Sequence, residues 1–172
     1  MVRNVRKWIS LIAAVVLYYV VHEGAHFIFA LLFGTFRRIR FAYWGMGIQI
    51  VADTEIMSDM QIFVFGIAGV AATLIAGYVF VWKRNRILGS ANKIVRAIAY
   101  YSTLIFLCLD PFYLSILYRF VGGGDMNSIV LIGIPEIAAT IFFIILLGVN
   151  LFIFIKMIYP AYKKRFTDGQ LQ

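Results

Sequence analysis

The two histidines of the chain both lie in one short segment, His22-Glu23-Gly24-Ala25-His26. The pattern His-Glu-x-x-His has a mechanical meaning on a helix, because residues four apart share a face and both imidazoles can bind one zinc ion. Zinc lowers the pKa of nearby water towards neutrality, and the intervening carboxylate can take its proton. The sequence therefore predicts one Zn²⁺ per chain, with His22 and His26 as ligands and Glu23 as the catalytic base.

A structural role for these histidines is the competing interpretation. Histidines in a membrane helix can bond to hydroxyls or backbone carbonyls of neighbouring helices. However, three ionisable groups so close together in an apolar helix are costly to bury, and such groups normally mark a functional site. Metal binding is therefore the expectation.

A catalytic zinc site also needs a third protein ligand and an open position. The chain has no third histidine and only one cysteine, Cys108, so a carboxylate must supply the ligand. Asp125 is favoured because the three glycines before it would let the chain bend back into a protein-lined cavity, although it could also be a solvated loop residue. Asp110 is the rival ligand, since it lies at comparable depth and Pro111 should disturb the helix beside it. If Asp125 binds the metal, Asp110 would orient a ligand or a water molecule instead.

The elements that position these residues are helices in a bilayer. The chain is 63% hydrophobic and 14% charged, with a mean hydropathy of +0.90. Four transmembrane helices are predicted over about 8–33, 61–82, 95–120 and 135–157, each near the length that crosses about 30 Å of hydrocarbon. The expected fold is an all-α membrane protein in one domain, 1–172, surrounded by the lipid bilayer. The first helix is expected to be an uncleaved span, because no small-residue cleavage site follows its basic start.

A β-hairpin at the membrane surface is predicted between the first two helices. Two alternating segments, 37–43 and 47–51, flank Trp44-Gly45-Met46, which suits a tight turn. The third connection, 121–134, is glycine-rich, and Pro135 followed by Glu136 suits the first turn of the last helix.

The distribution of basic residues predicts the orientation in the membrane. Twelve of the 16 Lys and Arg residues lie at the amino terminus, in the second connection or in the tail, so both termini should be cytoplasmic in a multi-pass cell-membrane protein. At about 1.5 Å per residue from Trp8, His22 then lies roughly 21 Å deep, in the outer half of the bilayer. The net charge of +8 comes from these clusters and not from a basic groove, so nucleic acid is not an expected partner.

These motifs together resemble the site-two protease family of intramembrane zinc metalloproteases. Members of that family carry His-Glu-x-x-His on an early span, then a glycine-flanked hairpin, then a span with Ala-Gly-Pro-x-x-Asn, and later an aspartate in Leu-Asp-Gly. In this chain Gly45-Met46-Gly47-Ile48 is similar to the hairpin, and Ala68-Gly69-Val70-Ala71-Ala72-Thr73 is similar to the second-span segment. The resemblance covers residues 15–75 well and the rest loosely.

The chain departs from the family pattern at three places. Val70 stands where the family has proline, and Thr73 stands where it has asparagine. Asp125 lies in Gly-Gly-Gly-Asp-Met-Asn, whereas Leu109-Asp110-Pro111 imitates part of Leu-Asp-Gly. Family members also commonly hold the metal nearer the cytoplasm than the charge distribution predicts here.

The resemblance implies a zinc-dependent intramembrane endopeptidase that acts on transmembrane or membrane-associated substrates. The substrate would unwind and add as a strand along the hairpin edge, where Gly45 and Gly47 allow close backbone approach, unless the hairpin is only a surface loop. The alternative is a non-proteolytic metal or proton transporter or sensor that uses the same His, Glu and Asp cluster. Glu23 separates the two, because a protease keeps it off the metal and a carrier can use it as a ligand. A catalytically inactive scaffold is a third interpretation, and the oligomeric state is not indicated.

Overall fold

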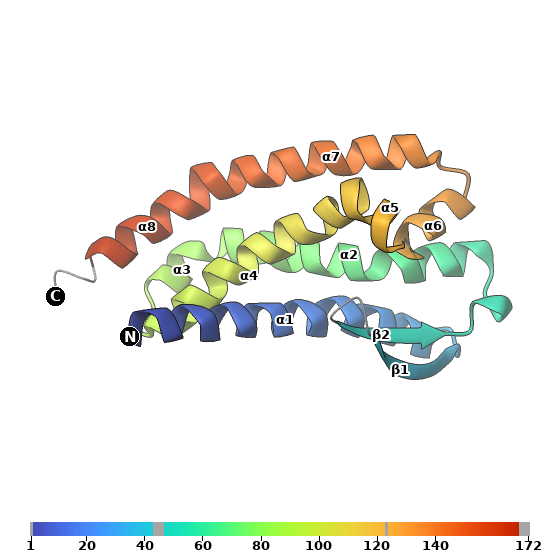
Figure 1. The fold of residues 1–172 in the computed structure, drawn as a ribbon, viewed down its shortest axis with the longest axis horizontal. Helices are drawn as coiled ribbons and strands as arrows, with labels where there is room; N and C mark the ends of the chain where they lie inside the picture. The colour runs from blue at the N-terminus through green and yellow to red at the C-terminus, as the bar shows by residue number, and fades with distance from the viewer. Residues whose placement is uncertain (1, 43–46, 123, 169–172) are drawn as a thin grey trace.

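The computed structural model describes residues 2–42, 47–122 and 124–168. Within these ranges, four helical stretches are long and apolar enough to cross a membrane: Asn4–Leu32, Asp59–Trp82, Lys93–Val121 and Glu136–Phe166. A two-stranded antiparallel hairpin follows the first of them (Figure 1). The predicted fold class, an all-α membrane protein with four long helices and one hairpin, is confirmed.

The elements follow one another in a simple order. They are α1 (Val2–Leu32), β1 (Phe36–Ala42), β2 (Gly47–Ala52), the short turn η1 (Thr54–Ile56), α2 (Asp59–Trp82), α3 (Arg84–Leu88), α4 (Lys93–Phe112), the π-helical turn η2 (Tyr113–Leu117), α5 (Tyr118–Val121), α6 (Gly124–Leu131), α7 (Glu136–Ile153), the π-helical turn η3 (Phe154–Ile158) and α8 (Tyr159–Asp168).

Local sequence explains where several of these helices begin. Ser58 and Gln61 form a reciprocal capping box at the start of α2. The side chain of Asn92 accepts hydrogen bonds from two backbone amides in the first turn of α4. Helix α7 begins at Glu136 directly after Pro135, as the sequence predicts.

The buried face of α1 presents the candidate site residues to the rest of the bundle. Its fully or nearly buried side chains recur every four residues, which keeps them on one face of the helix. They are Ser10, Ala14, Tyr18, His22, His26 and Ala30. The opposite face is apolar and exposed, for example at Ile12 and Val20, as expected for side chains that contact lipid.

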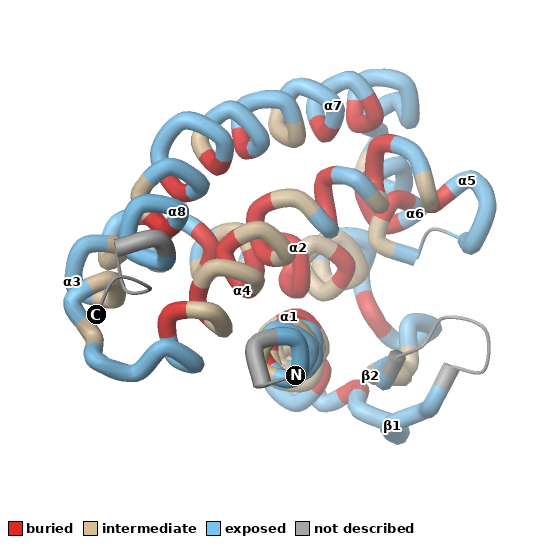
Figure 2. The backbone as a smooth tube through the Cα atoms, turned by 60° about the vertical axis from the view of Figure 1, so that its left-hand side comes forward, coloured by how far each residue is buried: buried red, intermediate tan, exposed pale blue. Residues whose placement is uncertain are grey.

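Helix α2 lies at the centre of the bundle and packs against α1, α4 and α6. Three glycines allow these close approaches: a Cβ at Gly66 would collide with Ser128, one at Gly69 with His22 and His26, and one at Gly77 with Leu107. Buried residues of α2 and α4 face the interior, whereas the outer side of α7 is exposed (Figure 2). The side chains of neighbouring helices therefore pack directly against the backbone of α2 at these three glycines.

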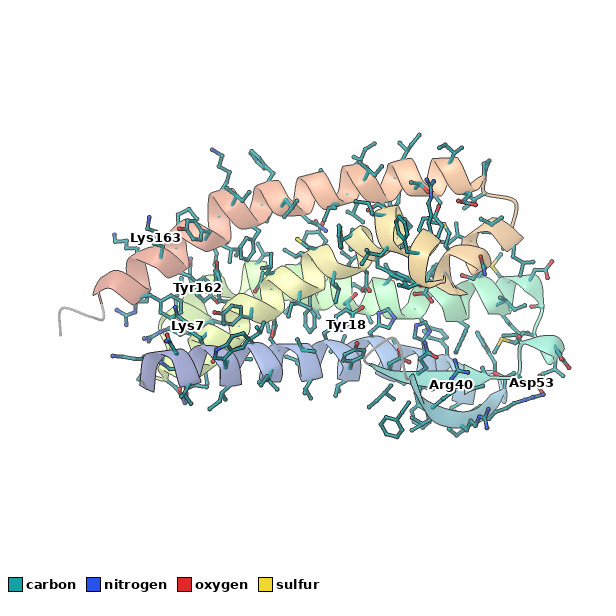
Figure 3. All side chains as sticks on the ribbon, in the orientation of Figure 1. Lys7, Tyr18, Arg40, Asp53, Tyr162 and Lys163 are labelled. Atoms are coloured by element: carbon teal, nitrogen blue, oxygen red, sulfur yellow. The ribbon has the colours of Figure 1, made fainter. Side chains whose placement is uncertain are left out.

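The bundle has two different ends. The start of α1, the basic helix α3 and the end of α8 lie together at one end, and the hairpin and α6 lie at the other (Figure 1). Lys7 and Lys163 belong to the first end, Arg40 and Asp53 to the second, and Tyr18 lies between them on α1 (Figure 3). This arrangement agrees with an even number of membrane crossings.

The hairpin has the predicted strands with slightly different bounds. Strands β1 and β2 pair antiparallel from Phe36 opposite Ala52 to Ala42 opposite Gly47. An Arg37–Asp53 ion pair with an Nη2–Oδ2 distance of 2.6 Å closes its base. Gly47 is the first residue of β2, whereas Gly45 lies outside the described residues.

The third connection and the last helical stretch have more helical structure than the sequence analysis described. The glycine-rich third connection contains the helix α6, which packs between α2 and α7, because Gly66 lets the Ser128 side chain approach α2 closely. The last helical stretch, in which the sequence predicts a membrane span over about 135–157, continues as helix to Phe166. A π-helical turn, η3, directly precedes the segment with Pro160, and such a turn changes the local hydrogen-bonding pattern so that the helix can pass a proline.

Pro111 disturbs the helix beside it, as the sequence predicts: α4 ends at Phe112 and the π-helical turn η2 follows directly, although the helical stretch as a whole continues to Val121. The carbonyl of Leu107 would normally accept from residue 111. Instead it accepts from Nδ2 of Asn150 on α7 at 2.6 Å, and Oδ1 of Asn150 accepts from the Tyr78 hydroxyl at 2.6 Å. Asn150 is fully buried, so it ties α2, α4 and α7 together.

Replacing Asn150 with leucine is expected to destabilise the folded protein by about 1 to 3 kcal/mol, because the Leu107 carbonyl and the Tyr78 hydroxyl lose their partner. The free energy of unfolding in mixed micelles measures the effect. Combining Asn150→Leu with Tyr78→Phe should cost less than the sum of the two single changes. Strict additivity would contradict the shared network.

Candidate metal centre

His22, His26 and Asp125 offer three ligand atoms that all lie within 4.8 Å of one another. The Nε2 atoms of the two imidazoles are 3.2 Å apart, and Oδ2 of Asp125 is 3.8 Å from Nε2 of His22. Two nitrogens bound tetrahedrally to zinc at its usual bond length are about 3.4 Å apart. The spacing of the two imidazoles therefore fits a shared metal ion.

The hydrogen-bond partners of the two rings assign their protons. Nδ1 of His26 lies 2.7 Å from the backbone carbonyl of Phe65, which can only accept, so this nitrogen carries the proton. Nδ1 of His22 lies 3.4 Å from the carboxylate Oδ1 of Asp110, which favours the same tautomer. In the neutral rings both Nε2 atoms then present lone pairs to each other at 3.2 Å, and either a proton between them or a metal ion bound by both relieves this repulsion.

Gly69 on α2 provides the space in front of the two histidines. A Cβ at this position would lie 2.6 Å from Nε2 of His22 and 2.6 Å from Nε2 of His26. Carbon and nitrogen atoms in ordinary contact are about 3.5 Å apart. Only glycine at residue 69 leaves this point, which is close to both Nε2 atoms, free for another atom.

Asp125 reaches the histidines from the first turn of α6. The Ser128 hydroxyl donates to the backbone carbonyl of Asp125 at 2.7 Å, and the close approach of Ser128 to Gly66 holds α6 against α2. Burial, together with the nearby carboxylates of Asp110 and Glu23, raises the pKa of the Asp125 carboxyl to about 7. A bound cation would favour its charged form and offset this effect.

Asp110 lies on the opposite side of His22 from Asp125. It is 1% exposed, and it accepts hydrogen bonds from the hydroxyls of Tyr18 and Thr73. Its carboxylate faces Nδ1 of His22, whereas Asp125 faces Nε2. The structure thus brings Asp125 into the group with both Nε2 atoms and gives Asp110 a place behind His22.

Glu23 is half-buried and bonds to the hairpin instead of joining the three grouped residues. Its Oε2 accepts a hydrogen bond of 2.9 Å from the backbone amide of Ile50 on β2. Amides along a strand alternate between its two edges, and the Ile50 amide bonds to Glu23 on α1, so it belongs to the edge of β2 that faces α1 and is not paired with β1. Glu23 therefore lies at the edge of β2 that has no partner strand among the described residues.

Three groups around the site were not identified from the sequence as contacts: the Tyr18 hydroxyl, the Phe65 carbonyl and the Ile50 amide. Tyr18 did carry a signal, because it lies four residues before His22 on the same helix face. The Phe65 carbonyl and the Ile50 amide are backbone atoms, and no side-chain pattern reveals them. Thr73 was noted only as a departure from a family motif.

Comparisons with protein-family models, curated proteins and solved structures find no match to this chain. The resemblance to the site-two protease family stays an interpretation of the motifs at residues 22–26, 45–48 and 68–73. One observation connects two of these motifs in space, since Gly69 of the third lies directly against His22 and His26 of the first.

Proposed function

We propose that this chain is a zinc-dependent intramembrane endopeptidase with His22, His26 and Asp125 as metal ligands and Glu23 as general base. The observation that carries the proposal is the pair of Nε2 atoms 3.2 Å apart, with each Nδ1 facing an acceptor and a carboxylate beside them. A zinc ion held by this group would supply Lewis acidity, which activates water and polarises the carbonyl of the peptide bond to be cut.

The position of Glu23 supports hydrolysis over metal transport. Glu23 directly follows His22 in the sequence, but its carboxylate bonds to the Ile50 amide and is not one of the three grouped ligands. A carboxylate in this position can take a proton from the attacking water and return it to the leaving amine. A carrier that used Glu23 as a ligand would need this side chain to leave Ile50.

The free edge of β2 suits an extended peptide as substrate. A two-stranded sheet leaves backbone groups unpaired along each outer edge, and peptides bind such edges by adding a strand. Glu23 bonds to the Ile50 amide at the outer edge of β2. A peptide docked there, from a transmembrane or membrane-associated protein, lies beside the general base.

The proposed location is the cell membrane, with both termini in the cytoplasm. The basic residues at the end that carries the termini and α3 support this orientation, since cytoplasmic loops are enriched in Lys and Arg. The hairpin and the metal ligands then lie nearer the outer face. Cysteine labelling of residues at the two ends in intact cells tests this orientation.

The decisive experiment measures zinc content and cleavage of a model transmembrane peptide by the purified protein in liposomes. We expect about one zinc per chain, loss of cleavage on chelation and recovery when zinc is returned. Metal that binds tightly without cutting any peptide would instead favour the transporter or sensor interpretation.

Alanine substitutions separate the two aspartates in the same assay. Asp125→Ala should lose most of the zinc, because it removes a ligand. Asp110→Ala should keep zinc with an affinity reduced about 10- to 100-fold, as is typical for a group that orients a ligand. The reverse pattern would make Asp110 the third ligand.

A further inference from the structure

Asp110 is the most tightly held carboxylate among the described residues near the candidate metal centre. The Tyr18 hydroxyl donates to Oδ1 and the Thr73 hydroxyl donates to Oδ2, so both oxygens have a partner. Oδ1 also lies 3.4 Å from Nδ1 of His22. These contacts join α1, α2 and α4 at one point. Tyr18 and Asp110 are 92 residues apart in the sequence.

The two hydroxyls restrict how the Asp110 carboxylate can turn. With one donor on each oxygen, rotation about its terminal bond would break two charge-assisted hydrogen bonds in a buried site. The orientation that remains directs Oδ1 at Nδ1 of His22. The imidazole is thereby held with its Nε2 towards His26 and Asp125.

Each hydroxyl is also placed by its own helix. Tyr18 lies one turn before His22 on α1, and its ring packs against the His22 ring with centroids 5.4 Å apart. Thr73 lies one turn after Gly69 on α2, and its hydroxyl is also within hydrogen-bond distance of the Gly69 and Val70 carbonyls. Tyr18 therefore lies beside the metal-ligand candidate His22, and Thr73 lies one turn from Gly69, which faces the Nε2 atoms of both histidines.

We propose that Tyr18 and Thr73 are positioning residues of the metal centre, which hold Asp110 so that His22 keeps the Nε2 lone pair directed at a bound divalent cation. This inference rests on the proposed metal ligands, but it does not require peptide hydrolysis. Neither residue contacts the Nε2 side of His22, where His26 and Asp125 lie. Their effect on a bound cation therefore passes through Asp110 and the His22 ring.

Cobalt binding to the metal-depleted protein in detergent tests the proposal, because Co²⁺ adopts zinc sites and its visible absorption reports ligand geometry. Tyr18→Phe and Thr73→Val each remove one hydroxyl and keep most of the side-chain shape. Each variant should bind Co²⁺ about tenfold more weakly, with an altered absorption spectrum. Thr73→Ser, which restores a hydroxyl, should recover most of the affinity of the unmodified protein.

Matched substitutions elsewhere in the bundle control for a general loss of packing. Tyr78→Phe removes a tyrosine hydrogen bond to Asn150, and Thr103→Val removes a buried hydroxyl that bonds to the Ala99 carbonyl. Both controls should lower thermal stability and leave the Co²⁺ affinity and spectrum unchanged.

The outcomes separate this proposal from the proposed function. If Tyr18→Phe and Thr73→Val bind Co²⁺ like the unmodified protein while Asp125→Ala does not, the positioning role is wrong and the metal centre stands. If the unmodified protein binds no Co²⁺, both proposals fail. If it binds Co²⁺ with the expected losses but cleaves no peptide, the positioning role stands and the endopeptidase proposal fails.

Discussion

Replacing Glu23 with glutamine is expected to leave zinc in place and to slow peptide cleavage by about 10² to 10⁴-fold. Glutamine has nearly the shape of glutamate, but its amide cannot accept the proton that a general base must take. Its carbonyl oxygen can still accept the hydrogen bond from Ile50, so the hairpin should keep its position beside α1. The variant therefore separates proton transfer from the placement of the hairpin. Zinc content and cleavage rate, measured on one preparation in liposomes, give both quantities.

Glu55→Gln is the matched control for this change. Glu55 is an exposed residue of the turn between the hairpin and α2, so its variant should keep both zinc and cleavage. If Glu23→Gln itself empties the site, Glu23 is a metal ligand and the transporter interpretation becomes the better one. If the variant cleaves at the normal rate, Glu23 is not the base.

Replacing Gly69 with alanine is expected to weaken zinc binding by about two orders of magnitude and to abolish cleavage with it. The added methyl group would lie 2.6 Å from each Nε2, about 1 Å inside ordinary contact, so the imidazoles or α2 must shift. Alanine is otherwise the better helix former, and the metal-free protein should lose little stability unless the rings cannot move. Zinc affinity, from competition with a chelator, measures the effect.

Gly24→Ala is the control, because it adds the same methyl group inside the His-Glu-x-x-His segment where nothing lies within 4 Å. This variant should retain zinc and gain slightly in stability. Normal zinc affinity in Gly69→Ala would mean that the metal does not lie in front of the two Nε2 atoms. That result would contradict the proposed ligand arrangement while leaving the helical fold intact.

Several features of this protein were predictable because they depend on neighbours along the chain. The four long helices follow from local runs of apolar residues, and the start of α7 follows from Pro135 and Glu136. The hairpin follows from two alternating segments. The shared face of His22 and His26 follows from their spacing of four on a helix.

Other features required contacts between distant segments. Depth along the helices did not decide whether Asp110 or Asp125 is the third metal ligand. Depth does not determine which side of the His22 ring a carboxylate reaches. The structure separates them, with Asp110 at Nδ1 and Asp125 at Nε2. The glycine-rich third connection contains the helix α6, whose position depends on the close contact between Gly66 and Ser128.

The sequence by itself determined the helices, the hairpin and the histidine–glutamate motif, because hydrophobicity, turn residues and helical periodicity act over a few residues. Only the tertiary structure decided the surroundings of the motif. Three of these surroundings are contacts between different helices: the Phe65 carbonyl with His26, Gly69 with both histidines, and the hydrogen bond from Tyr18 to Asp110. Their positions depend on how α1, α2 and α4 pack, and close packing at glycines and buried polar groups is a property of the whole bundle.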